Sequence, residues 1–377
     1  MVDTTQVRGI SPGKAEKTLI GLTQDETSRL TAEAARTALE EASDQERALK
    51  RVKKALVDKK LVIVTGAGVT LDATGYVPGG ELERLKWKGL IEHGFRYLER
   101  NCKPAISDQK KTRERVETID NGRHFLSQSK TESHLLAAQI LRKELEEEGH
   151  FAAWLDSVFD DLPIKNEALL AALEALHENG AILLTTNYDH LLDRYCRLET
   201  IHRSATNDLL RFRRGRAFKD GVFHIHGSYQ NPDDVILDPI DYYKVKVSSE
   251  VQDFLRKCLQ DDLVLFVGCG DGLGDANFSA LLRWITDKHR TIAHTHCLLV
   301  TNDDSYSFNP LVRLKYGANH SDLGPWLRTK LLGEPSLRDY PGSLFERSHS
   351  NIGEYTSTPT PHCPQLPPEV ERNVRCD

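Results

Sequence analysis

The chain has 377 residues, a formal net charge of -6 and a hydrophobic content of 39%. The charged fraction of 28% and the mean hydropathy of -0.47 are typical of a soluble protein. No apolar run is long enough to predict a membrane span, and the N-terminus lacks the apolar segment of a secretory signal. The absence of a long basic block argues against a nucleic-acid partner. We therefore expect a cytoplasmic protein, with a nuclear one as the alternative, that binds neither membranes nor nucleic acid.

The first part of the chain predicts a flexible segment, a helix and a buried strand. Residues 1–25 show no apolar periodicity and are expected to be flexible. Residues 26–57 are expected to be helical, because Leu30, Val52 and Leu56 recur at roughly helical spacing among charged residues. This helix would either pack on the core or form an oligomer contact. The β-branched run at 61–64 then predicts a strand that is buried on both faces.

Residues 81–179 are expected to form a helical insertion, with helices at 133–148 and 166–179. Beyond it, apolar runs predict strands at 181–186, 222–226, 263–267 and 296–301. Helices are expected between and after these strands, at 190–197, 249–260, 276–288 and 323–332. The alternation predicts an α/β fold: a Rossmann-like parallel sheet with helices on both faces and an inserted helical layer. Residues 58–332 would form this domain, and the proline-rich segment 333–377 is expected to be a disordered tail.

The cysteines argue against a disulfide framework and against a cysteine-rich zinc site. Seven are present and widely scattered, and none form a Cys-x-x-Cys pair. An odd number without close pairs favours a reducing compartment.

Glycines and polar residues follow the ends of all five predicted strands. They are Gly66-Ala67-Gly68, Thr185-Thr186-Asn187-Tyr188-Asp189, His226-Gly227, Gly268-Cys269-Gly270 and Asn302. Ligands of open α/β sheets bind beyond the carboxyl ends of the strands. The agreement across five strand ends therefore favours a ligand site at this edge of the sheet.

Each motif also has a structural explanation. The first glycine turn could be a plain strand-to-helix connection, and Asp189 could cap the helix that follows it. His224 and His226 would share one strand face as a metal pair, but no third ligand stands at a recognisable spacing. Cys269 has no basic neighbour in sequence, so we interpret it as a small packing residue.

Taken together, the four motifs at 66–70, 185–189, 226–227 and 268–270 resemble those of the sirtuin superfamily, over about residues 58–332. The residues of these motifs are similar to those of the zinc-free, NAD-cleaving branch found among bacterial defence proteins and animal sirtuin-like proteins. The features that carry this second likeness are Trp87-Lys88-Gly89-Leu90, His224-Ile225-His226-Gly227, and Asp275 after the late glycine turn. Sirtuin deacylases carry two close cysteine pairs between the histidine and the late turn, whereas this chain has only Cys258 there. The resemblance therefore implies a domain without zinc.

The resemblance implies that NAD+ is the substrate, with His226 and Asn187 as catalytic residues. His226 would hydrogen-bond the ribose and act as a base, Asn187 would orient the ribose hydroxyls or the attacking water, and Asp189 would accept from the nicotinamide amide. The implied NAD+-binding residues are Gly66, Ala67, Gly68, Thr70, Asp189, Gly227, Gly268, Cys269, Gly270, Asp275 and Asn302.

The function that the resemblance implies is hydrolysis of NAD+ to nicotinamide and ADP-ribose, with activation by assembly into a homo-oligomer or filament. Two alternatives stay open. One is an NAD-dependent deacylase or ADP-ribosyltransferase, which would require an acylated or acceptor protein for turnover. The other is a non-enzymatic scaffold that binds NAD+ or ADP-ribose and controls assembly.

Overall fold

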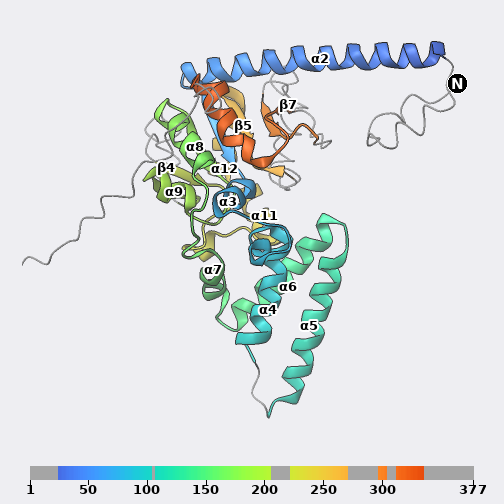
Figure 1. Cartoon of the computed structure of the whole chain (residues 1–377). Helices are drawn as coiled ribbons and strands as arrows, with labels where there is room; N and C mark the ends of the chain where they lie inside the picture. The colour runs from blue at the N-terminus through green and yellow to red at the C-terminus, as the bar shows by residue number, and fades with distance from the viewer. Residues whose placement is uncertain (1–23, 104–106, 205–220, 271–295, 304–310, 335–377) are drawn as a thin grey trace, which may run out of the picture. The chain divides into compact units, whose positions relative to one another are not determined.

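The computed structural model describes residues 24–103, 107–204, 221–270, 296–303 and 311–334 (Figure 1). The predicted flexible N-terminus, the proline-rich tail from 335 onward, the helix at 276–288 and Asp275 lie outside these residues. Within them, no helix is both long and apolar enough to cross a membrane.

A seven-stranded sheet forms the centre of the fold, and all of its strand pairs are parallel. The strands lie in the order β3-β4-β2-β1-β5-β6-β7. Their bounds are β1 Leu61–Thr65, β2 Ile182–Thr185, β3 Glu199–His202, β4 Gly221–His224, β5 Leu263–Val267, β6 Cys297–Val300 and β7 Val312–Lys315. In the register, Thr65 of β1 lies beside Thr185 of β2 on one side and Val267 of β5 on the other. The predicted Rossmann-like α/β class is thereby confirmed.

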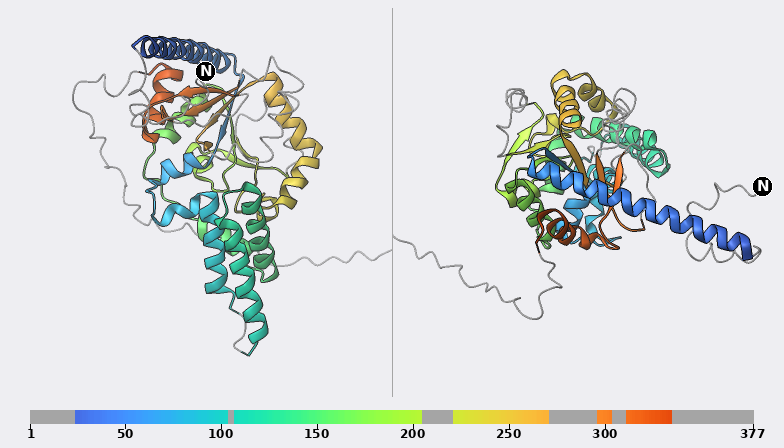
Figure 2. Two further views of the ribbon diagram at one scale, coloured as in Figure 1. Left: turned by 90° about the vertical axis from the view of Figure 1, so that its right-hand side faces the viewer. Right: turned by 90° about the horizontal axis from the view of Figure 1, so that it is seen from above.

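Helices cover both faces of the sheet. On one face Leu61 and Ile63 belong to a core shared with α2, α3, α8 and α15. On the other face Val62 and Val64 belong to a second core shared with α12. Figure 2 (left) shows α12, in yellow, on one side of the strands and α15, in orange, on the other. Because alternate residues of β1 serve two different cores, the strand must be apolar along its whole length.

The described helices begin and end as follows. They are α2 Gln24–Val57, α3 Ala67–Thr74, η3 Glu81–Leu85, α4 Trp87–Asn101, α5 Gln109–Ser127, α6 Thr131–Glu147, α7 Phe151–Phe159, α8 Ala168–Glu178, α9 Leu191–Cys196, η4 Pro232–Asp234, α11 Pro239–Val247, α12 Ser249–Asp261, η6 His320–Asp322, α15 Leu323–Leu327 and η7 Arg328–Leu332. The predicted helix at 323–332 is thus an α-helix that continues as a π-helical turn.

The helices α4 to α7 form the inserted layer between β1 and β2, and α4, α5 and α6 lie together in Figure 1. Phe95, Leu141 and Trp154 are fully buried between these helices and belong to the first core. A buried arginine connects the insertion to the rest of the domain. Arg142 of α6 forms an ion pair with Asp241 of α11 and donates to the Val235 carbonyl oxygen at 2.9 Å. The insertion is therefore fixed to the segment that follows β4.

His296, at the start of β6, gives the sheet a testable pH dependence. Its side chain is fully buried, and its Nδ1 accepts a hydrogen bond from the Val264 N–H at 3.1 Å. Burial lowers the pKa of His296 to about 4. A protonated His296 is thus disfavoured in the folded state, so stability is complete above the ordinary histidine pKa and is lost as pH falls through about 4.

We predict that His296→Asn makes the free energy of unfolding less sensitive to pH between about 7 and 4, by about 3 kcal/mol over that range. Urea unfolding at a series of pH values measures this. The exposed His124 provides the control, because His124→Asn should keep the parent's pH profile. An unchanged profile in His296→Asn would contradict the prediction.

Candidate functional site

The carboxyl ends of the parallel strands meet at one edge of the sheet, and the candidate site lies there. From β1 the chain proceeds towards β2 on one side, whereas from β5 it proceeds towards β6 on the other. The strand order therefore changes direction between β1 and β5, which is where such sheets bind ligands. The two predicted glycine turns, 66–68 and 268–270, follow these two strands.

The two glycine turns are in direct contact with each other. The Gly66 N–H donates to the Val267 carbonyl oxygen at 3.0 Å, and the Gly68 N–H donates to the Gly268 carbonyl oxygen at 2.8 Å. A Cβ atom on Gly68 would lie 2.8 Å from the Gly268 Cα, which no side chain tolerates without a shift. Gly66, Gly68 and Gly268 are thus required by the contact between the turns. Of the first turn, Ala67 is exposed at the start of α3, where a phosphate could approach.

Asn187 is half-buried beyond the end of β2 and is held by several hydrogen bonds. Its Nδ2 donates to the Gly66 carbonyl oxygen at 3.0 Å and to Thr70 Oγ1 at 2.8 Å. Because a carbonyl oxygen only accepts, these bonds fix which way the amide is turned. Within the described part of the chain, Asn187 Oδ1 makes no hydrogen bond. Asn187 Oδ1 is therefore an acceptor of fixed direction that can receive a hydrogen bond from a hydroxyl group or a water molecule.

Thr70 links Asn187 to a buried carboxylate. Its hydroxyl accepts from Asn187 and donates to Asp189 Oδ2 at 2.5 Å. The other oxygen of Asp189 accepts from the N–H of Leu191, the first residue of α9, at 3.0 Å. The N-cap position itself is held by His190, so the prediction that Asp189 caps the helix is wrong. Burial raises the pKa of Asp189, whose side chain is 5% exposed. The predicted contact of Asp189 with the nicotinamide amide stays a prediction.

The two histidines of the third motif lie in different environments. Strand β4 ends at His224, and the following turn brings the Gly227 N–H to the His224 carbonyl oxygen at 3.2 Å. The His224 ring contacts Asp193 of α9, whereas the His226 ring lies 6.1 Å from the ring of Tyr242 of α11. The expectation that the pair shares one strand face is wrong, because His226 already belongs to the turn.

Gly227 itself cannot be replaced without cost. It adopts a left-handed conformation at φ +78°, and an added Cβ would lie 2.3 Å from the Asp234 carbonyl oxygen. The Ile236 N–H donates to the His226 carbonyl oxygen at 2.9 Å. His226 is therefore held between the end of β4 and the segment that leads into α11.

The remaining predicted residues lie at the ends of β5 and β6. Cys269 is buried, burial raises its pKa to about 12, and its Sγ lies 3.4 Å from the Val64 carbonyl oxygen. These properties agree with a packing residue. Gly270 and Asn302 are exposed, and the Asn302 N–H donates to the Gly317 carbonyl oxygen at 2.8 Å.

Sequence reasoning did not identify Asp193, which bonds the first histidine of the His-Ile-His-Gly motif. Both of its oxygens approach His224 Nε2, at 3.0 and 3.1 Å, and Thr200 Oγ1 donates to it at 2.8 Å. The signal in the sequence is weak: Asp193 stands four residues after Asp189, which precedes α9.

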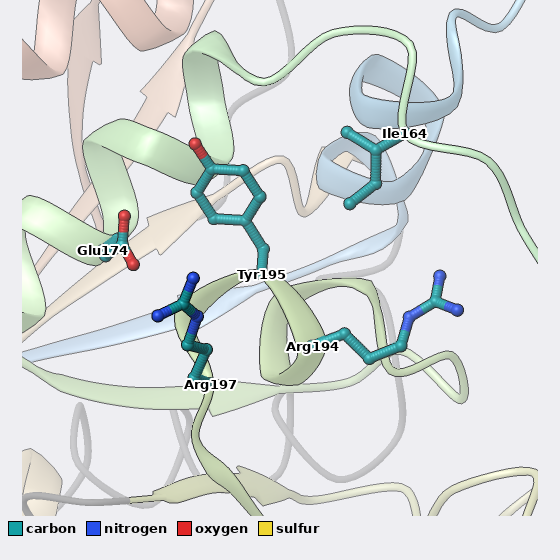
Figure 3. Close-up of a pocket in the computed structure, with 5 residues that line it drawn as sticks. All are labelled: Ile164, Glu174, Arg194, Tyr195 and Arg197. Carbon is teal, nitrogen blue, oxygen red and sulfur yellow. The ribbon is translucent and has the colours of Figure 1, made fainter. Parts of the chain in front are cut away.

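A cavity of about 530 Å³ lies elsewhere, against α8 and α9 (Figure 3). Figure 3 shows Arg197 extending towards Glu174, while Arg194 points away from both. None of the predicted NAD+-binding residues lines this cavity, whose lining is Ile164, Glu174, Arg194, Tyr195 and Arg197. The cavity is thus separate from the strand-end site.

Metal ligands do not gather in the part of the chain that the structure describes, since no group of three or more histidine, cysteine or acidic side chains there could hold an ion. Cys258, the one cysteine between His226 and the late glycine turn, is buried in α12, and burial raises its pKa well above the usual value. The expectation of a domain without zinc stays an expectation.

Residues 181–320 match the family model of the SIR2-like domain. The matched segment begins just before β2 and includes Asn187, His226 and the turn at 268–270, whereas the turn at 66–68 precedes it. Over these residues the chain is similar to the SIR2-like domain.

We predict that Gly268→Ala destabilises the protein more than Gly270→Ala does, by about 1–3 kcal/mol. Both glycines have a positive φ, +65° and +39°, so backbone strain is common to the two variants. Only at Gly268 would the new Cβ meet other atoms, with the Val69 nitrogen at 2.9 Å and nothing within 4 Å at Gly270. Urea unfolding of both variants measures the difference, and equal losses would show that the contact between the turns is not tight.

Proposed function

We propose that the chain is an NAD+ glycohydrolase. The reaction consumes NAD+ and water and yields nicotinamide, ADP-ribose and a proton. The bond between nicotinamide and ribose breaks, and an oxygen of water forms the new bond to the anomeric carbon. Support comes from the SIR2-like match at 181–320 and from the arrangement of Asn187 at the strand ends.

Cleavage of this bond does not require a strong acid or base in the active site. The nicotinamide leaving group is already cationic in the substrate, so positive charge develops on the ribose as the bond breaks. The enzyme must hold the dinucleotide and place water next to the anomeric carbon. Side chains that accept hydrogen bonds in fixed directions can perform this second task.

Asn187 is the observation that carries the proposal. Its Nδ2 is occupied by Gly66 and Thr70, so its Oδ1 is the atom that can accept from the attacking water or from a ribose hydroxyl. Thr70 in turn donates to Asp189, which is held by the start of α9. The amide therefore cannot rotate without breaking a chain of three hydrogen bonds.

His226 follows the strand that neighbours β2 in the sheet. We assign to it the contact with the ribose and the removal of the proton from water; general base catalysis contributes about 10²–10⁴-fold to such reactions. The turn at 66–68, with Ala67 exposed, would receive the pyrophosphate.

We predict that Asn187→Ala and His226→Ala each lower the rate of nicotinamide release by about 10²-fold, because both remove a group that positions or activates water. The measurement is release of nicotinamide and ADP-ribose by purified protein at high concentration. Asn179→Ala is a matched control, since Asn179 Nδ2 also donates to a backbone carbonyl oxygen, that of Ala175 at 2.8 Å, but on an exposed helix end.

The control should keep the parent's rate. Parent-like rates in both Asn187→Ala and His226→Ala would overturn the assignment of these residues. If Asn187→Ala lowers only the melting temperature, then Asn187 merely supports the turn at 66–68.

We also propose that the protein self-associates through the first part of α2. Among the side chains of this helix that the structure describes, the buried ones lie near its C-terminal end, at Ala48, Val52, Ala55 and Leu56. Leu39, two turns earlier, is 74% exposed. We place the contact at this exposed leucine, because among the described side chains of α2 it is the exposed large apolar residue that lies away from the buried end of the helix.

We predict that Leu39→Glu lowers the average mass measured by light scattering, because a charge there opposes burial against a second copy. Val57→Glu is the control, since Val57 is similarly apolar and 80% exposed at the end of the same helix. Equal behaviour of the two variants would contradict a contact centred on Leu39.

A further inference from the structure

We propose that His224 and Asp193 form a positioning pair that fixes the main chain of Asn187. The inference rests on the proposed function, because that function assigns the contact with water or ribose to Asn187. Neither His224 nor Asp193 is among the residues that the sequence assigned to NAD+. The pair would act through Asn187 without touching the substrate.

The His224 ring uses both of its nitrogens. Nδ1 lies 3.1 Å from the Asn187 carbonyl oxygen, and a carbonyl oxygen can only accept, so Nδ1 carries a hydrogen and donates. Nε2 faces both oxygens of Asp193, at 3.0 and 3.1 Å. The ring therefore bridges α9 to the loop after β2, and the carboxylate determines how the ring is turned.

Burial makes this bridge rigid. The His224 side chain is fully buried and Asp193 is 3% exposed. A carboxyl group at such a depth is unfavourable unless hydrogen bonds compensate it, and here the Thr200 hydroxyl donates to it. Because Nδ1 already donates to Asn187, the contact between His224 Nε2 and Asp193 holds one further hydrogen, either on the nitrogen or on the carboxyl group. Thr200 belongs to β3, the edge strand, so this strand contributes directly to the orientation of the carboxylate.

The neighbouring histidine does not compete for the carboxylate. The His190 ring lies edge-on to His224, with ring centroids 5.2 Å apart. Burial lowers the pKa of His190 to about 4, so this ring is neutral at pH 7. His190 thus packs against the bridge as an uncharged ring.

Asn187 is consequently held from two sides. Its carbonyl oxygen accepts from His224, and its side-chain amide donates to Gly66 and Thr70. Its N–H donates to Thr185 Oγ1 at 3.1 Å. Every polar group of the residue except Oδ1 has a partner among the described residues, so the direction of Oδ1 is set by the surrounding protein. In well-positioned sites a misplacement of 1 Å can cost about 10²-fold in rate.

The first test compares His224→Phe with His296→Phe in the full chain. Both variants replace a fully buried histidine of the sheet, but only His224 bonds Asn187. For NAD+ cleavage we expect kcat to fall about 10–100-fold in His224→Phe, with KM within about twofold of the parent. His296→Phe should lose thermal stability while its kcat is kept. Equal losses of kcat in the two variants would overturn the proposal, because general destabilisation would explain both.

The second test does not need turnover. Hydrogen exchange of the Asn187 side-chain amide, assigned by its disappearance in Asn187→Ala, reports directly how firmly that amide is held. We expect faster exchange in His224→Phe than in His296→Phe. Unchanged exchange overturns the positioning pair even if the protein cleaves NAD+. Faster exchange in a protein that releases no nicotinamide supports the pair and places the failure in the proposed function.

A milder variant covers the case in which His224→Phe does not fold. Thr200→Val removes the hydroxyl that donates to Asp193 at nearly constant volume, and Thr200→Ser retains it. We expect faster Asn187 amide exchange and a kcat lowered about 2–5-fold in Thr200→Val, with recovery in Thr200→Ser. Parent-like exchange and kcat in Thr200→Val would count against the pair.

Discussion

The packing of two glycine turns against each other, at the point where β1 and β5 lie side by side, is the constraint on which the site depends. Gly68 and Gly268 approach so closely that neither position has room for a side chain. This contact holds the start of α3 against the end of β5. Because Thr70 lies in the first turns of α3, the same contact places the hydroxyl that receives the Asn187 amide. The positions of the strand ends thus determine which side chains can hydrogen-bond to Asn187.

The fold was predictable where burial alone determines it. The central strands contain short apolar runs because their two faces belong to two cores, and β1, β2, β4, β5 and β6 could be identified from this pattern. The edge strands β3 and β7 could not. Glu199–His202 and Val312–Lys315 mix polar and apolar residues, and they become strands through pairing with a neighbour that sequence does not reveal.

The positions of the site residues at the strand ends were predictable from the sequence, but their hydrogen-bond partners were not. The motifs placed Gly66, Asn187, His226 and Gly268 at strand ends, because parallel strands bring their carboxyl ends to one edge. The partners of these residues come from segments far apart in sequence. Thr70 lies 117 residues before Asn187, and no spacing rule connects two such positions. Asp193, which holds His224, gave only the weak signal of its position four residues after Asp189.

The inserted helices are mechanically connected to the site. Arg142, in the middle of α6, is buried and pairs with Asp241 at the start of α11, and its guanidinium also bonds the Val235 carbonyl oxygen. The adjacent Ile236 N–H holds the carbonyl oxygen of His226. A displacement of α6 would therefore be transmitted to the turn that carries His226, first through the bond from Arg142 to the Val235 carbonyl oxygen and then through the bond from the Ile236 N–H to the His226 carbonyl oxygen. Breaking a buried ion pair is costly, so the insertion and this turn are expected to move together.

The orientation of the Asn187 amide also limits which chemical changes this position tolerates over the lifetime of the protein. Nδ2 lies between two oxygen atoms, those of Gly66 and the Thr70 hydroxyl. Loss of the amide nitrogen by spontaneous deamidation would leave a carboxylate facing the Gly66 carbonyl oxygen, where two acceptors repel each other. The change alters one atom of the side chain and almost nothing in its size. A deamidated molecule would thus retain its fold while losing the two hydrogen bonds that set the direction of Asn187 Oδ1.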